Sequence, residues 1–209
     1  MRFHIKLCRY SGAFGCNLGG SQDAPDMTLS AQIPTRYDPM TIRLHWATAI
    51  LVVFLWVTGQ TADFFPRGPV RNAEWSLHVV FGFLLGFVLI ARLIWRLGRG
   101  QRIPPADVGI VGLAATATHV LLYALLVAAV TLGIANAFVR GMSLFGVWSL
   151  PQIGDPALRR DLTEWHELAA NLTMILALVH AGAALAHHYL WHDGVLQRMM
   201  PPRDGRPAG

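Results

Sequence analysis

The chain has 209 residues, of which 14% are formally charged and 54% are hydrophobic. A soluble domain typically carries about 25% charged residues, so this composition argues against a globule that faces water on all sides. With 20 Gly, 12 Pro and two Cys, it also argues against a disordered chain, collagen and a disulfide-stabilised scaffold. A membrane protein is the class that remains, and its unusual component is nine His beside 12 acidic residues.

Four apolar stretches follow one another along the chain. Each is long enough to cross a hydrocarbon layer, which needs about 20 helical residues. They cover residues 41–62, 75–97, 113–138 and 164–191. In lipid a segment must satisfy its own backbone hydrogen bonds, and the alternation typical of barrel strands is absent from the sequence, so these stretches are expected to be helices. The sequence predicts an all-α bundle of four transmembrane helices over residues 36–202.

Lys and Arg are distributed unevenly between the two sides of these spans. The N-terminal region, the second loop and the C-terminal tail hold 12, whereas the first and third loops, which face what we call the outer side, hold 5. Cytoplasmic loops carry such an excess, so we expect both termini in the cytoplasm. Residues 1–35 lack the apolar core and cleavage site of a secretory signal and predict a disordered extension, with Met27 as an alternative start. Residues 203–209 are expected to form a short cytoplasmic tail.

Histidines recur inside the spans, where ionisable side chains are costly and usually ligate cofactors, relay protons or contact substrates. His45 enters the first span from the cytoplasmic side, and His78 opens the second span on the outer side. On the fourth span His166 and His180 are 14 residues apart, which places them on one face about 21 Å apart along the axis. Matching depths predict two pairs between helices, His78 with His166 and His45 with His180.

Facing imidazole pairs inside a helical bundle are the axial ligands that an iron porphyrin needs. Zinc fits less well, because structural zinc sites gather four ligands in one place and favour thiolates. Covalent haem attachment needs a Cys-x-x-Cys-His motif, which the sequence does not contain. The sequence therefore predicts two non-covalent b-type haems, with His45, His78, His166 and His180 as the ligands of iron.

Other residues near these pairs suggest further contacts. Gly59 follows His45 by 14 residues and predicts packing against a haem, and Arg92 follows His78 by 14 residues and predicts a contact with a haem propionate. Gly82 and Gly86 would let either a flat ring or another helix approach closely.

Two histidines have no settled role in this scheme. By depth alone His187 could partner His45, although the 14-residue interval favours His180. His187 is then either a quinone or proton-relay residue near the inner haem, or an interfacial histidine solvated beside Trp191. His119, on the third span, is expected to serve first in packing or hydrogen bonding.

Several motifs resemble the bacterial cytochrome b561 family, the four-helix di-haem quinone-linked cytochromes that include superoxide oxidase. The resemblance covers about Tyr37 to Pro202, and its fourth-span signature is specific. The matching motifs are Arg43-Leu44-His45-Trp46, Phe64-Phe65-Pro66-Arg67, Leu77-His78-Val79, Trp165-His166-Glu167, Ala170-Asn171-Leu172, Leu178-Val179-His180, Ala184-Leu185-Ala186-His187-His188-Tyr189 and Arg198-Met199-Met200-Pro201.

The resemblance implies an oxidoreductase of the bacterial inner membrane. Its two haems would be ligated by the same four histidines. In the superoxide oxidase branch, superoxide from the periplasm is oxidised to O2 and its electron passes through the haems to ubiquinone. That branch carries a Lys just before the Trp-His of the fourth span, where this chain has Thr163-Glu164-Trp165. The expected partners are membrane lipid, ubiquinone and superoxide or another periplasmic electron donor, and no nucleic acid. The alternative is a cytochrome b electron-transfer and anchor subunit of a larger dehydrogenase or hydrogenase.

Overall fold

The computed structural model of the chain describes residues 36–100 and 109–201, all of which belong to one compact unit, Ile33–Gly209. The extension expected over residues 1–35 and the tail expected over residues 203–209 lie outside the described residues.

Four long helices make up most of the described chain. They are α1 (Pro39–Thr61), α2 (Pro69–Gly98), α3 (Gly109–Arg140) and α4 (Arg159–Ala186). Each is long and apolar enough to cross a membrane, so the prediction of an all-α fold with four membrane-spanning helices is confirmed. The shorter elements are η1 (Ala62–Phe64), β1 (Ser143–Leu144), β2 (Trp148–Ser149), η2 (Pro156–Leu158), η3 (His187–Trp191) and η4 (Leu196–Met199).

The helices begin earlier than the apolar stretches do. Pro69 occupies the first turn of α2, where its missing N–H costs nothing, six residues before the predicted start. α4 begins at Arg159, five residues before the predicted start. Its first turn is polar, so the hydropathy pattern does not include it. Consequently His78 and His166 lie more than a turn inside their helices rather than at the helix starts.

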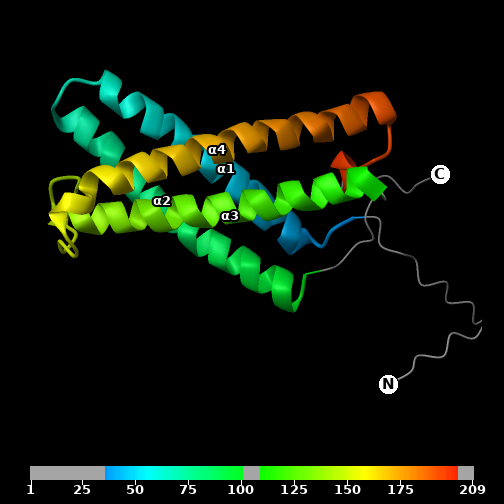
Figure 1. Cartoon of the computed structure of the whole chain (residues 1–209), viewed down its shortest axis with the longest axis horizontal. Coiled ribbons are helices and arrows are strands. Elements are labelled where there is room, and N and C mark those ends of the chain that lie inside the picture. The colour runs from blue at the N-terminus through cyan, green and yellow to red at the C-terminus, as the bar shows by residue number, and fades with distance from the viewer. Residues whose placement is uncertain (1–35, 101–108, 202–209) are drawn as a thin grey trace, which may run out of the picture. The chain divides into compact units, whose positions relative to one another are not determined.

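The helices are arranged as two antiparallel pairs, α1 with α2 and α3 with α4, and the pairs cross each other (Figure 1). Leu55, Leu85, Leu89 and Leu126 form a buried cluster where α1, α2 and α3 meet. Hydrocarbon tails are as apolar as leucine, so in lipid the hydrophobic effect does not drive helices together. Close packing of this kind holds them together instead. Long side chains on the outside remain exposed, among them Phe87, which a lipid layer would surround.

We call the end of the bundle at which α1 begins the inner end, and hydrogen bonds there join segments that are far apart in the sequence. The indole Nε1 of Trp46 donates to the Met199 carbonyl at 2.9 Å, and the indole Nε1 of Trp95 donates to Asp38 Oδ1 at 3.0 Å. Asp38 also caps α1 by accepting from the Thr41 backbone N–H. These bonds fix the start of α1, and with it the depth of His45.

Candidate functional site

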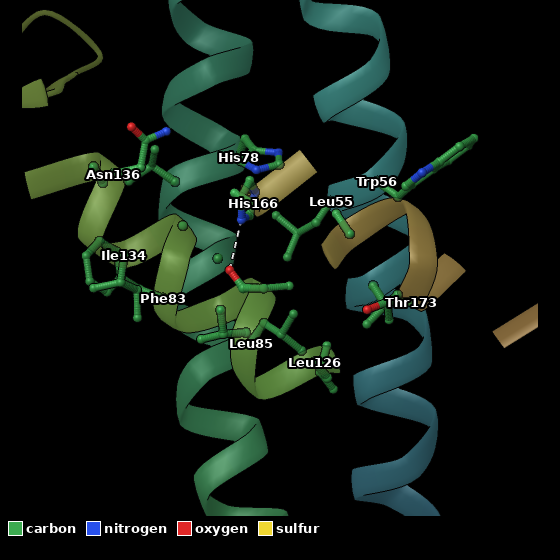
Figure 2. Close-up of a pocket in the computed structure, with 18 of the residues that line it drawn as sticks. Leu55, Trp56, His78, Phe83, Leu85, Leu126, Ile134, Asn136, His166 and Thr173 are labelled. Atoms are coloured by element: carbon green, nitrogen blue, oxygen red, sulfur yellow. Dashed lines mark hydrogen bonds between the residues drawn. The ribbon is translucent and has the colours of Figure 1, made fainter. Parts of the chain in front are cut away.

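The outer pair of histidines faces into a cavity between the helices. The ring centres of His78 and His166 are 6.1 Å apart, with their planes at 87°. Figure 2 shows the two rings close together, with Leu55 beside them and Leu85 and Leu126 below. The cavity is mostly apolar and opens to the surface of the bundle, and ligand sites are commonly apolar clefts with a few polar groups.

Hydrogen bonds fix the protonation of both outer rings. His166 Nδ1 lies 2.9 Å from the Ala129 carbonyl oxygen, which can accept but not donate, so Nδ1 carries the hydrogen (Figure 2). Thr58 Oγ1 donates to the Leu55 carbonyl at 3.0 Å and therefore accepts from His78 Nδ1, also at 3.0 Å. Each outer ring is thus left with a free lone pair on Nε2, the form of histidine that binds a metal.

Glycines make room for these two rings. A Cβ atom at Gly133 would lie 2.8 Å from His166 Cε1, and one at Gly59 would lie 3.3 Å from His78 Cε1. The structure therefore places Gly59 against the ring of His78. Sequence reasoning overlooked Gly133, because it lies on α3 and shares no interval with the histidines.

The two glycines that follow His78 have different surroundings. A Cβ atom at Gly86 would lie 3.4 Å from Val130 Cγ1, so this glycine lets α3 pack closely against α2. Gly82 has open space around it and lines the cavity. Of the two uses that the sequence left open, Gly86 therefore serves helix packing and Gly82 leaves space for a ring.

The inner pair has a similar separation but different neighbours. The ring centres of His45 and His180 are 6.4 Å apart, with their planes at 72°. Arg92 Nη2 lies 3.0 Å from His45 Nδ1, and because a guanidinium only donates, this nitrogen accepts. The Arg92 guanidinium also lies 5.1 Å from the centre of the Tyr123 ring, at cation–π distance. The inner pair therefore has a positive charge, that of Arg92, against the ring of His45.

Two further histidines lie toward the inner end. The ring of His119 is 5.2 Å from that of His180, so α3 adds a third imidazole at this level, which sequence spacing did not reveal. His187 begins a single π-helical turn after α4, its ring packs on Trp191, and its Nδ1 is hydrogen bonded to Asp193. That bond holds the pKa of the Asp193 carboxyl below its usual value.

The ring-centre separations of the two pairs can be compared with the distance expected for two imidazoles bound to one metal ion. A metal–imidazole bond is about 2.0 Å long and the nitrogen lies about 1.1 Å from the ring centre, so two axial imidazoles have centres about 6.3 Å apart. The measured 6.1 and 6.4 Å agree with this value, whereas the 5.2 Å between His119 and His180 is too short. Both predicted pairs therefore have the separation that a shared haem iron would need, and at the inner pair Arg92 would have to turn away from His45.

Comparison with known proteins agrees with these features. A family model described as "Prokaryotic cytochrome b561" matches residues 36–202. "Probable superoxide oxidase CybB" of Yersinia pestis is 30% identical over 177 residues, which cover 81% of this chain and 98% of that protein. "Cytochrome b561 homolog 1" of Escherichia coli is 31% identical over 181 residues, with coverages of 80% and 98%. "Cytochrome b562" of Cereibacter sphaeroides is 33% identical over 175 residues, with coverages of 80% and 96%. The chain belongs to the prokaryotic cytochrome b561 family of multi-pass membrane proteins, which bind haem b and transfer electrons.

Proposed function

We propose that this protein is an inner-membrane oxidoreductase that carries electrons from a periplasmic donor, superoxide, through two haem b groups to ubiquinone. In this proposal His78 and His166 hold the outer haem, His45 and His180 hold the inner haem, and both termini face the cytoplasm. The observation that carries it is the pair of imidazole separations, 6.1 and 6.4 Å, at two depths of one bundle. When bound, each haem supplies an iron that accepts and releases one electron.

The protein's own residues then orient and insulate this path. The Ala129 carbonyl and Thr58 hydroxyl hold the outer imidazoles in the form that binds iron. Hydrogen bonds to the second ring nitrogen orient a metal-binding histidine and raise its basicity. At the inner level Arg92 would bind a propionate, since a guanidinium forms strong paired hydrogen bonds with a carboxylate.

Positive charge beside the outer cavity supports an anionic donor. Arg140 Nη2 donates to Thr163 Oγ1 at 2.7 Å, and Asn136, which lines the cavity, also bonds to Thr163. Thr163 lies three residues before His166, so the Arg140 guanidinium is held close to the outer pair. The relative from Yersinia pestis named as a probable superoxide oxidase supports the same donor.

At the other end we propose His187 as the group that binds quinone or passes protons to it. Its Nδ1 is bonded to Asp193, which leaves Nε2 to face a bound ring or a water molecule. The π-helical turn at this residue also agrees, because such turns are frequent at functional sites.

The test is superoxide-driven reduction of a ubiquinone analogue by the purified, haem-loaded protein. The proposal predicts quinol formation that superoxide dismutase abolishes and that the His78→Ala and His45→Ala variants lose. Haem-loaded protein that superoxide cannot reduce would contradict the proposed donor. Co-purification with a dehydrogenase or hydrogenase that does reduce it would establish the electron-transfer subunit in its place.

A further inference from the structure

A partly buried carboxyl group, that of Glu74, lies one helical turn from His78 and has no role in the proposed electron path. Glu74 precedes His78 by one helical turn on α2 and so lies on the same face of the helix. Its Oε1 is 2.5 Å from Thr61 Oγ1 on α1. Its Oε2 is buried and has no hydrogen-bond partner among the described residues. An ionised carboxylate placed in this way would leave a charged oxygen without a donor, which is costly.

Thr61 can bond to Glu74 in either of two directions. Thr61 Oγ1 lies 2.9 Å from the Val57 carbonyl oxygen, which can only accept, as well as 2.5 Å from Glu74 Oε1. A hydroxyl group has one hydrogen. Thr61 therefore donates to an ionised Glu74 Oε1, or donates to Val57 and accepts from a protonated Glu74 Oε1.

Thr58, one turn earlier on α1, shows the same arrangement. It gives its hydrogen to the Leu55 carbonyl and receives one from His78 Nδ1. Two threonines of α1 therefore each bond to a titratable group of α2, and these two groups, Glu74 and His78, are one turn apart.

The other charged groups around Glu74 are few. The facing stretch of α1, Leu55–Thr61, has no ionisable side chain, and neither has β1. From η1 comes Asp63, which is paired with Arg71 of α2. On α2 itself the neighbouring group is His78, which faces His166 of α4. Because Asp63 and Arg71 neutralise each other, a change of charge at the outer pair, one turn away, would act on Glu74.

We propose that Glu74 is a proton-binding site linked to the oxidation state of an iron held by His78 and His166. The inference rests on the proposed function, because it needs an iron between His78 and His166. An iron held by His78 and His166 would lose one positive charge on taking up an electron from the outer donor. A proton from the outer aqueous side then binds the Glu74 carboxylate and forms the Oε1–H that Thr61 accepts. One electron and one proton enter together, and no other bond forms or breaks.

A redox titration of the haem-loaded full chain at several pH values tests this proposal. The outer midpoint potential should fall as pH rises, by up to about 59 mV for each tenfold drop in proton concentration, the one-electron equivalent. Glu74→Gln stays neutral yet can still donate to Thr61, so the slope should disappear. Glu164→Gln removes an exposed carboxylate at the same end, paired with Arg160, and should keep the slope.

Infrared spectroscopy gives a second reading that does not depend on a variant. The reduced-minus-oxidised spectrum of the wild type should gain the carbonyl band of a protonated carboxyl, and the band should shift in D2O. An outer midpoint that does not change with pH, a slope that survives Glu74→Gln, or the absence of this band would overturn the proposal. Failure of the wild type to bind an outer haem would instead overturn the proposed function.

Discussion

The outer and inner histidine pairs have nearly the same separation but opposite hydrogen-bonding environments. Each outer Nδ1 donates to an oxygen, Thr58 Oγ1 or the Ala129 carbonyl. At the inner pair His45 Nδ1 accepts from Arg92, and His119 stands beside His180. The proposed function would therefore use the outer pair as neutral imidazoles that bind iron, whereas a propionate would have to neutralise the Arg92 guanidinium at the inner pair. Two histidine pairs with equal spacing can thus differ in whether Nδ1 donates or accepts a hydrogen bond.

Removal of a ligand should produce the largest effect and should separate the two sites. His78→Ala should leave about one haem per chain, bound at the inner level, because one imidazole cannot replace the six-coordinate pair. His45→Ala should leave the outer haem. Pyridine haemochrome assays and optical redox titrations measure the number and the identity of the haem that remains. Loss of both haems from a variant that still folds would contradict independent sites.

Gly133→Ala should remove nearly as much haem, but from the outer site alone. The added Cβ would lie 2.8 Å from His166 Cε1, closer than real contacts allow, so the ring must move away from the Ala129 carbonyl. Haem titration should show loss of the outer haem with the inner one retained. Gly98→Ala, where a Cβ meets nothing within 4 Å, is the control. Equal haem content in both variants would show that the close contact at Gly133 is unimportant.

Thr58→Val should weaken the outer site without abolishing it. Valine has the shape of threonine but cannot accept from His78 Nδ1, and loss of such a supporting hydrogen bond typically costs about 10–100-fold in metal affinity. Thr48→Val is the matched control, since Thr48 is also buried on α1 and bonds to the Leu44 carbonyl of its own helix. Competition for haem with apomyoglobin measures the difference. Similar losses in both variants would point to a general effect on α1.

Arg92→Gln should act on the inner site and by a smaller factor. A hydrogen bond to a charged group contributes about 1.5–3 kcal/mol, or roughly tenfold or more in affinity. The inner haem should dissociate about tenfold faster, and the outer haem should be unaffected. Slower dissociation of the inner haem would show that Arg92 competes with haem for His45 rather than binding a propionate.

The smallest effect is expected from Asp193→Asn, at the inner end, and only in acid. The bond from His187 lowers the pKa of Asp193 in the folded protein. The stability that this bond adds is present above the usual aspartate pKa and is lost as pH falls through the lowered value. Thermal unfolding over a pH series should show this acid-side loss in the wild type and not in the variant. Parallel pH profiles would contradict it.

The sequence allowed the bundle and the histidine pairing to be predicted because both depend on regular spacing. Hydropathy located four helices, and the 14-residue interval on α4 placed two histidines on one face, opposite His45 and His78. Helix starts were less predictable, because the polar first turn of α4 at Arg159 does not differ from a loop in hydropathy.

The residues that control the rings could not be found in this way. Gly133 and the Ala129 carbonyl belong to α3, whose rotation against α4 depends on side-chain packing and not on any pattern within α3. The contact of His119 with His180 has the same origin. The partner of Glu74 Oε1, Thr61, lies across the α1–α2 turn, and no spacing rule connects the two.

If one chain holds two haems at two depths, the haem content of the purified protein will show it. The pyridine haemochrome assay, combined with a protein determination, should give two haem b per chain, resolved by redox titration into two components. His78→Ala and His45→Ala should each remove a different component. One haem or none in the wild type, or loss of the same component in both variants, would contradict the account.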